Sequence, residues 1–211
     1  MTGSDTRQRI FDAASQLFYE KGFDKTTVAE IISLSETNKG SFYHHFEDKQ
    51  HLAYNIGFVL LNSIEAGVRS LFPDAEVIER LFLQNGVFWR VFFAEQNIRG
   101  FISEIFGISY ISVKADVFDA ILDLSPASLS NRDLLMIGGV EVALTTRLTA
   151  YVGRIADRLR SDELFRFYMR TWLGIYQVPE EIIDSHVDKA LELLAGLEVT
   201  SRGFEVTIRQ A

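Results

Sequence analysis

The polar and aromatic side chains of residues 38–46 have the types and spacing of a surface that forms hydrogen bonds to a partner. Phe42 and Phe46 are four residues apart and share one helical face, whereas Lys39 and Tyr43 point away from that face. A second short helical pattern precedes this run across a few turn residues. Two short helices joined by a tight turn are typical of a helix-turn-helix, which places its second helix in a DNA groove.

Local sequence signals support both helices. Thr27 and Glu30 have the spacing of a capping box, in which each side chain accepts a hydrogen bond from a backbone N–H at the helix start. Asn38 is a favourable N-cap for the second helix. Because Gly40 costs that helix about 1 kcal/mol relative to Ala, we expect it to allow close approach of another helix or of DNA.

The neighbouring elements complete a compact head over residues 1–47. Residues 4–20 have apolar side chains at three- and four-residue intervals, which predicts a first helix that ends at Gly22. A fourth helix is expected from Asp48 to Leu71, and it would be about 36 Å long at 1.5 Å per residue. That length would let it connect the head to the rest of the chain.

The combined motif comprises Phe18, Gly22, Phe23, Thr26, Thr27, Val28, Ile31, Lys39, Gly40, Ser41, Phe42, Tyr43, His44, His45, Phe46, Lys49 and Leu52. It resembles the N-terminal domain of TetR-family transcriptional regulators over roughly residues 5–55. The Phe-Tyr-His-His-Phe run, with a lysine three positions later, is its most specific part. The resemblance implies that the second helix of the motif enters the major groove. The DNA-binding residues that it implies are Thr27, Asn38, Lys39, Ser41, Tyr43, His44 and Lys49.

The turn departs from the pattern of that family, where it usually reads Ala-Gly-Val-Ser. Here residues 35–38 read Ser-Glu-Thr-Asn. If position 36 adopts a left-handed conformation, Glu36 costs about 1–2 kcal/mol that glycine would avoid. Glu36 also brings a negative charge to the expected DNA surface, so an unusual operator preference is expected.

Composition argues against several function classes. The 211-residue chain has no cysteine, which excludes disulfides and thiolate metal sites and favours a cytoplasmic protein. We expect no signal peptide, because the N-terminal segment is polar, and no membrane span, because charges interrupt the apolar stretches before about 18 residues. No motif indicates a catalytic group, a cofactor or a metal site.

The charge balance is the main argument against DNA binding. The net charge is −8, and residues 1–55 contain six basic and eight acidic side chains. Phosphate contacts are local, however, so the placement of Lys39 and Lys49 on the expected surface matters more than the total.

The remainder of the chain is predicted to be an all-α body over residues 48–197. Its helical patterns cover residues 48–71, 75–95, 98–108, 110–123, 130–159, 162–176 and 180–196. Gly138 and Gly139 fall within one of these helices, where close helix packing explains them best. In residues 198–211, polar and apolar side chains alternate on either side of Gly203. This pattern predicts either a short hairpin or a frayed or packed C-terminal arm.

Aromatic residues are dense between Phe82 and Phe106. Ordinary core packing explains such density, and the functional alternative is the wall of an apolar ligand pocket with a few polar groups. The candidate ligand-binding residues are Trp89, Phe93, Phe106, Tyr110, Arg147 and Tyr151, with Glu141 as a further polar group. Arg147 would be the partner of an anionic ligand.

These observations favour a ligand-responsive transcriptional regulator, most often a repressor in such a family, that binds a palindromic double-stranded DNA operator as a homodimer. An apolar or aromatic small molecule would be its effector. Apolar residues on the late helices predict the dimer interface: Leu134, Leu135, Val142, Leu148, Leu164, Trp172 and Leu191. The alternative is a small all-helical enzyme or ligand carrier whose head no longer binds DNA, which Glu36 and the acidic head favour.

Overall fold

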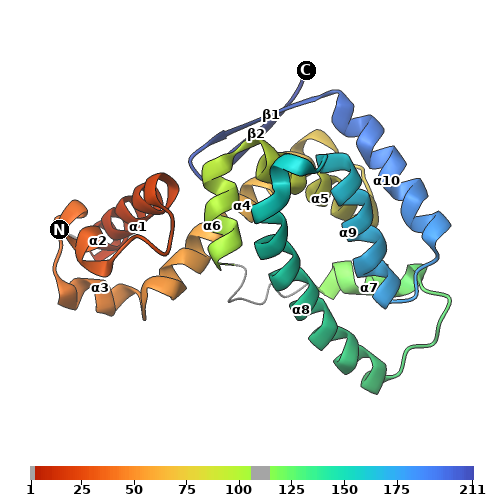
Figure 1. Ribbon diagram of the computed structural model, residues 1–211, viewed down its shortest axis with the longest axis horizontal. Helices are drawn as coiled ribbons and strands as arrows, with labels where there is room; N and C mark the ends of the chain where they lie inside the picture. The colour runs from red at the N-terminus through yellow and green to blue at the C-terminus, as the bar shows by residue number, and fades with distance from the viewer. Residues whose placement is uncertain (1–2, 106–114) are drawn as a thin grey trace.

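The computed structural model describes residues 3–105 and 115–211. Their architecture is all-α apart from one two-stranded hairpin, which confirms the predicted fold class. A small N-terminal head lies at one end of the molecule, and a larger helical body forms the rest (Figure 1). None of the helices in these residues is long and apolar enough to cross a bilayer.

Three helices form the head: α1 (Gly3–Lys21), α2 (Val28–Leu34) and α3 (Lys39–His45). Gly22 ends α1 with φ +86°, a backbone conformation that L-residues rarely adopt, so the predicted glycine stop is confirmed. Ile10, Phe18, Phe42 and Phe46 are all buried and form the centre of the head. Each helix is thereby held by its apolar face, because a seven-residue helix is not stable in isolation.

Helix α4 (Lys49–Leu71) leaves the head and enters the body, as predicted. The body also contains α5 (Val77–Ala94), α6 (Gln96–Ile105), α7 (Ala115–Leu124), α8 (Asn131–Ile155), the short 3-10 helix η1 (Ala156–Arg158), α9 (Ser161–Ile175) and α10 (Glu180–Ala195). Each helix expected from the sequence is confirmed within the described residues. Helices α5, α9 and α10 pack against one another and bury Trp89, Phe92, Phe165 and Leu173.

The C-terminal segment forms an antiparallel hairpin of β1 (Leu197–Arg202) and β2 (Glu205–Gln210). Its inward side chains, Val206 and Ile208, are buried against α4. A Cβ on Gly67 of α4 would stand 2.9 Å from Ile208 Cδ1, so the glycine permits this close approach. The hairpin therefore braces the middle of α4, and Val206 N–H donates a 2.9 Å hydrogen bond to Ser63 Oγ.

Two polar side chains of the body hold the loop that joins α1 to α2. Glu104, on α6, accepts hydrogen bonds from the N–H groups of Phe23 at 2.6 Å and Asp24 at 3.1 Å. Lys49, the first residue of α4, donates to the carbonyl oxygens of Phe23 at 2.8 Å and Thr26 at 2.9 Å. We call Glu104 and Lys49 the loop clamp, because together they fix both faces of this loop.

Aromatic packing surrounds the loop clamp. Phe18 of α1 stacks on Phe101 of α6 with ring centroids 5.7 Å apart. Phe101 also contacts Phe204 of the hairpin at 4.4 Å, and Phe204 in turn meets Tyr19 of α1 edge-on at 5.7 Å. Head, α6 and hairpin thus share one apolar contact, so the orientation of the head depends on the position of α6.

Candidate functional site

The start of α2 and the turn between α2 and α3 have the local chemistry expected from the sequence. Thr27 Oγ1 accepts from Glu30 N–H at 3.2 Å, and Glu30 Oε2 accepts from Thr27 N–H at 2.8 Å, which confirms the capping box. Glu36 has φ +51°, so the left-handed conformation considered for position 36 is confirmed and costs about 1–2 kcal/mol. Hydrogen bonding between the hydroxyl groups of Ser35 and Thr37, at 2.8 Å, flanks this residue.

Helix α3 presents a polar face away from the head. Lys39 and His44 are exposed, and Tyr43 is 49% exposed, whereas Phe42 and Phe46 are buried beneath them. Lys39 Nζ lies 6.0 Å from the centroid of the Tyr43 ring, a distance at which cation–π attraction is weak. These three polar side chains form one accessible surface, which we call the α3 face.

Asn38 and Ser41 serve the start of the same helix. Asn38 Oδ1 accepts from the backbone N–H of Ser41 at 2.9 Å, so the predicted N-cap is confirmed. Asn38 is exposed and Ser41 is half-buried. Gly40 has no neighbour other than the Asn38 side chain near its Cβ position, so no other helix approaches it among the described residues. The open side of α3 is therefore available to DNA.

Lys49 has a structural role that the sequence did not reveal. Its ammonium group donates to two loop carbonyls and lies 4.0 Å from the centroid of the Phe23 ring. One of its three N–H donors remains for a phosphate. Sequence reasoning missed this role because the contacts join residues more than 20 positions apart, and helical periodicity does not show such contacts.

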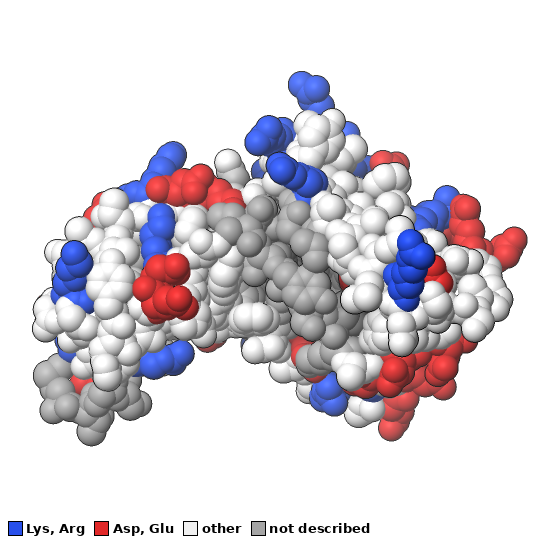
Figure 2. Space-filling view, turned by 90° about the horizontal axis from the view of Figure 1, so that it is seen from below, with Lys and Arg blue, Asp and Glu red and all other residues white. Residues whose placement is uncertain are grey.

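Charges of both signs are mixed over the head. Figure 2 shows the molecule from below, with Lys and Arg scattered between acidic groups on the head and acidic side chains gathered on part of the body. The α3 face therefore has Lys39 as its basic group without a continuous basic stripe around it. DNA binding by such a surface would depend on specific contacts more than on non-specific attraction.

The body contains a cavity of about 280 Å³ between α4, α5, α7, α8 and α9. Of the six predicted ligand-binding residues, Trp89 lines it. Its other walls include Phe88, Glu141, Tyr168 and Trp172. Glu141 was considered from the sequence, but Tyr168 and Trp172 were missed because periodicity identifies the buried face of α9 without showing what it faces.

The remaining ligand-binding predictions need correction. Phe93 is half-buried and does not line the cavity, because it lies on another side of α5 and contacts Phe92. Arg147 and Tyr151 are exposed, because the inward face of α8 consists of residues such as Glu141, Thr149 and Val152. The anion partner proposed for Arg147 therefore fails. Two further candidates, Phe106 and Tyr110, lie outside the described residues.

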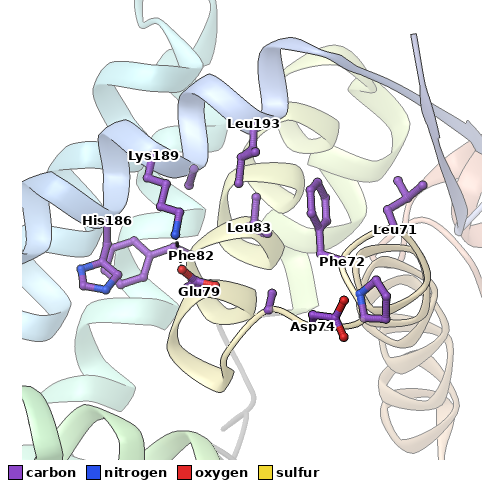
Figure 3. Close-up of a pocket in the computed structure, with 12 residues that line it drawn as sticks. Leu71, Phe72, Asp74, Glu79, Phe82, Leu83, His186, Lys189 and Leu193 are labelled. Carbon is purple, nitrogen blue, oxygen red and sulfur yellow. Dashed lines mark hydrogen bonds and ion pairs between the residues drawn. The ribbon is translucent and has the colours of Figure 1, made fainter.

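A second cavity of about 330 Å³ lies between the α4–α5 turn and α10 (Figure 3). Glu79 and Lys189 form an ion pair across it, and the Lys189 ammonium group lowers the pKa of the Glu79 carboxyl. His186 stacks on Phe82 with centroids 5.1 Å apart, and its Nδ1 lies 2.9 Å from Ile182 O. Because these polar groups bind one another, this cavity is a weaker ligand site than the first.

Comparison with known proteins identifies the head. The family model described as "Bacterial regulatory proteins, tetR family" matches residues 10–54. The HTH-type transcriptional repressor DhaR of Mycobacterium sp. (strain GP1) is 31% identical over 85 residues, which cover 40% of this chain and 43% of that protein. The HTH-type transcriptional regulator QacR of Staphylococcus aureus is 40% identical over 50 residues, which cover 24% and 27% of the two chains. The chain thus spans less than half the length of these curated relatives.

Two solved structures align with this chain at low identity and with TM-scores below 0.5. A gamma-butyrolactone receptor (ArpA-like protein) covers 92% of this chain and 97% of its own, with 19% identity and a TM-score of 0.41. The alignment with the fatty acid degradation regulator FadR from Bacillus halodurans covers 79% of this chain and 97% of FadR. The identity is 15% and the TM-score is 0.48.

The Glu30 carboxylate, held by Lys21 and by the capping box, gives the head a pH dependence. A hydrogen bond from Lys21, followed by those from Thr27, lowers the pKa of Glu30 from 4.5 to about 2. A lowered folded-state pKa stabilises the fold above the unfolded value, and this contribution is lost as the pH falls from about 4.5 to about 2. Glu30→Gln should therefore lower Tm at pH 7, with a difference from wild type that shrinks below pH 4.5.

Thermal melts followed by circular dichroism at neutral pH and at pH values below 4.5 measure this difference. Glu192→Gln, an exposed change of the same charge on α10, is the control and should match wild type throughout. An equal Tm difference for Glu30→Gln in neutral and acidic buffer would contradict the assigned role.

Proposed function

We propose that this chain, whose residues 10–54 match the model of the tetR family of bacterial regulatory proteins, is a ligand-responsive transcriptional repressor. In this proposal residues 1–47 bind an operator, residues 48–197 bind the effector and dimerise, and residues 198–211 brace the body. The protein would act in the cytoplasm as a homodimer on a palindromic site. The observation that carries the proposal is the exposed α3 face, within a head that matches the family model.

The size of α3 supports a dimer. Seven residues at 1.5 Å per residue give a helix of about 10 Å, which reaches only a few base pairs. Two copies related by a two-fold axis would read half-sites about 34 Å apart and thereby gain specificity. Lys39, Tyr43 and His44 would contact bases or phosphates. Thr27, Asn38 and Ser41 would hold the first turns of α2 and α3 in the conformation that approaches DNA.

The cavity has a physical connection to the head. Thr149 of α8 lines the cavity, and its carbonyl oxygen lies 3.4 Å from Ser103 Oγ of α6, whose hydroxyl hydrogen is donated to Arg99 O at 2.7 Å. The next residue, Glu104, belongs to the loop clamp. Helix α4 provides a second connection, because Lys49 completes the clamp at one end while Phe58 lines the cavity further along the helix.

The proposed switch requires differential affinity of the effector for two arrangements of these helices. A ligand that shifts α6 or α4 would move the loop clamp and change the separation of the two heads in the dimer. Coupling of about 1–3 kcal/mol between the sites would alter DNA affinity about 5- to 150-fold. The sequence suggested an apolar or aromatic effector, and the aromatic walls of the cavity support that class.

The dimer surface is best placed on the first half of α8. Leu135 is 81% and Met136 65% exposed. Beyond the adjoining backbone of α8, no atom of the described residues lies within 4 Å of a Cβ built on Gly138 or Gly139. The close packing predicted for these glycines is therefore wrong within the described residues of one protomer. This part of α8 extends beyond the neighbouring helices (Figure 1), so a second copy could bury it.

The predicted dimer residues need correction in part. Leu164 and Trp172 are buried inside the protomer, because α9 turns them toward α5 and the cavity. Leu134, Leu148 and Leu191 are half-buried and pack on the core. Leu135 is the member of the predicted set that remains free to meet a partner, and the side chain of Val142 lies outside the described residues.

DNA binding by the α3 face is tested with fluorescence anisotropy on duplexes from the regions upstream of its own and neighbouring genes. Lys39→Ala should weaken binding to all sequences and reduce the salt slope by about 1, as expected for one lost phosphate contact. Tyr43→Phe should also weaken operator binding, because it removes one hydroxyl while leaving the ring against Phe42.

Arg209→Ala removes an equal charge from the exposed end of the hairpin and should leave DNA affinity unchanged. Unchanged affinity in both Lys39→Ala and Tyr43→Phe would show that another surface meets DNA. Failure of the wild-type protein to bind any of these duplexes at low salt would favour the alternative of a ligand carrier.

Dimerisation is tested by multi-angle light scattering. The wild-type protein should have a mass of about 48 kDa, twice the 24.0 kDa of the chain. Leu135→Asp should shift it to the monomer, since a buried unpaired charge opposes association. Leu34→Asp, on an exposed apolar residue of the head, should remain dimeric. A wild-type mass of one chain at micromolar concentration would contradict the dimer.

A further inference from the structure

The cavity between α4 and α9 contains a buried donor without an acceptor. Trp89 is 1% exposed and lines the cavity, and its indole Nε1 has no hydrogen-bond partner among the residues that the structure describes. An unpaired buried N–H costs free energy, and native proteins rarely leave one without a purpose. The unpaired N–H marks Trp89 as a residue of the cavity wall whose position ordinary packing does not explain.

The same cavity contains a buried carboxyl group without a cation. Glu141 is 8% exposed, and its two oxygens accept from Trp172 Nε1 at 2.8 Å and from the Tyr176 hydroxyl at 2.9 Å. No Lys, Arg or His within residues 3–105 or 115–211 forms an ion pair with it. Two neutral donors use about half of the lone-pair sites on a carboxylate, so acceptor capacity remains for a ligand.

Aromatic rings enclose the cavity next to this carboxyl group. Trp89 and Tyr168 lie 5.4 Å apart, centroid to centroid, and Tyr168 and Trp172 lie 5.7 Å apart. The face of each ring has negative electrostatic potential, which attracts a cation within about 6 Å. A carboxyl group beside three such rings is a chemically favourable environment for a positively charged nitrogen.

The basic residues of the cavity already have partners. Arg69, whose side chain is 61% exposed, forms an ion pair with Glu65 at 3.0 Å. Arg80 donates from Nη1 to the carbonyl oxygen of Ala75. An anionic ligand would meet arginines that already bind a carboxylate or a carbonyl, whereas a cation would meet a carboxyl group with no charged partner among the described residues.

We propose that this cavity binds an amphipathic organic cation, a protonated amine or quaternary ammonium on an aromatic body. The nitrogen would lie against Glu141 between Trp89, Tyr168 and Trp172. This inference rests on the proposed function in identifying the cavity as the effector site, and it gives the class of the effector.

Isothermal titration of the full-length protein with three matched probes tests the ligand class. Naphthyl-ethylamine carries a positive charge, naphthyl-ethanol none and naphthyl-acetate a negative charge on the same ring system. The amine should bind at least about tenfold more tightly than the alcohol, as expected for a hydrogen bond between charged groups. The acetate should bind most weakly.

Variants then locate the charged contact. Glu141→Gln should weaken amine binding about tenfold and change alcohol binding less than about twofold. Trp89→Phe should weaken both probes, because it replaces the indole ring in the cavity wall with a smaller ring. Asp119→Asn, an equal charge change at an exposed position of α7 outside the cavity, should change neither. Circular dichroism and Tm confirm that each variant is folded.

Three outcomes would overturn the inference: no binding of the amine, tightest binding of the acetate, or unchanged amine affinity in folded Glu141→Gln. Release of operator DNA is measured separately with the same amine. Binding that depends on Glu141 but does not release DNA would support the ligand class and contradict the proposed regulatory role.

Discussion

The position of the DNA-binding head depends on how the body holds the loop between α1 and α2. Both backbone groups of Phe23 are bound by the loop clamp, its N–H by Glu104 and its carbonyl by Lys49. These are hydrogen bonds with charged side chains, which are stronger than neutral ones. Because α6 supplies one member and α4 the other, a relative shift of the two helices would change the loop and carry the head with it.

The aromatic contacts make this connection specific. Phe101 packs on Phe18 of the head and on Phe204 of the hairpin, so α6 cannot move without repacking a close apolar contact. On its other side α6 meets α8 where Ser103 approaches Thr149, a residue of the cavity wall. The same short helix therefore touches the head and the proposed effector site. Such a position is what a coupling element requires.

The sequence predicted the features that local chemistry determines. The Thr27–Glu30 capping box, the Asn38 cap and the glycine stop at Gly22 each depend on residues a few positions apart. The cavity depends instead on which helical faces meet. Apolar periodicity predicted that α5 and α9 are buried, but it could not place Tyr168 beside Trp89, nor turn Arg147 away from the cavity. The structural role of Lys49 was missed for the same reason, since its partners lie across the head–body junction.

Backbone hydrogen exchange at Phe23 and Asp24 is the most direct test of the loop clamp as the junction between head and body. The account predicts that both amides are protected in the wild-type protein and exchange faster in Glu104→Ala, while amides of α3 keep their protection. Adding a ligand of the cavity should change exchange at these two amides in the wild type. Equal exchange at Phe23 and Asp24 in wild type and Glu104→Ala would contradict the account.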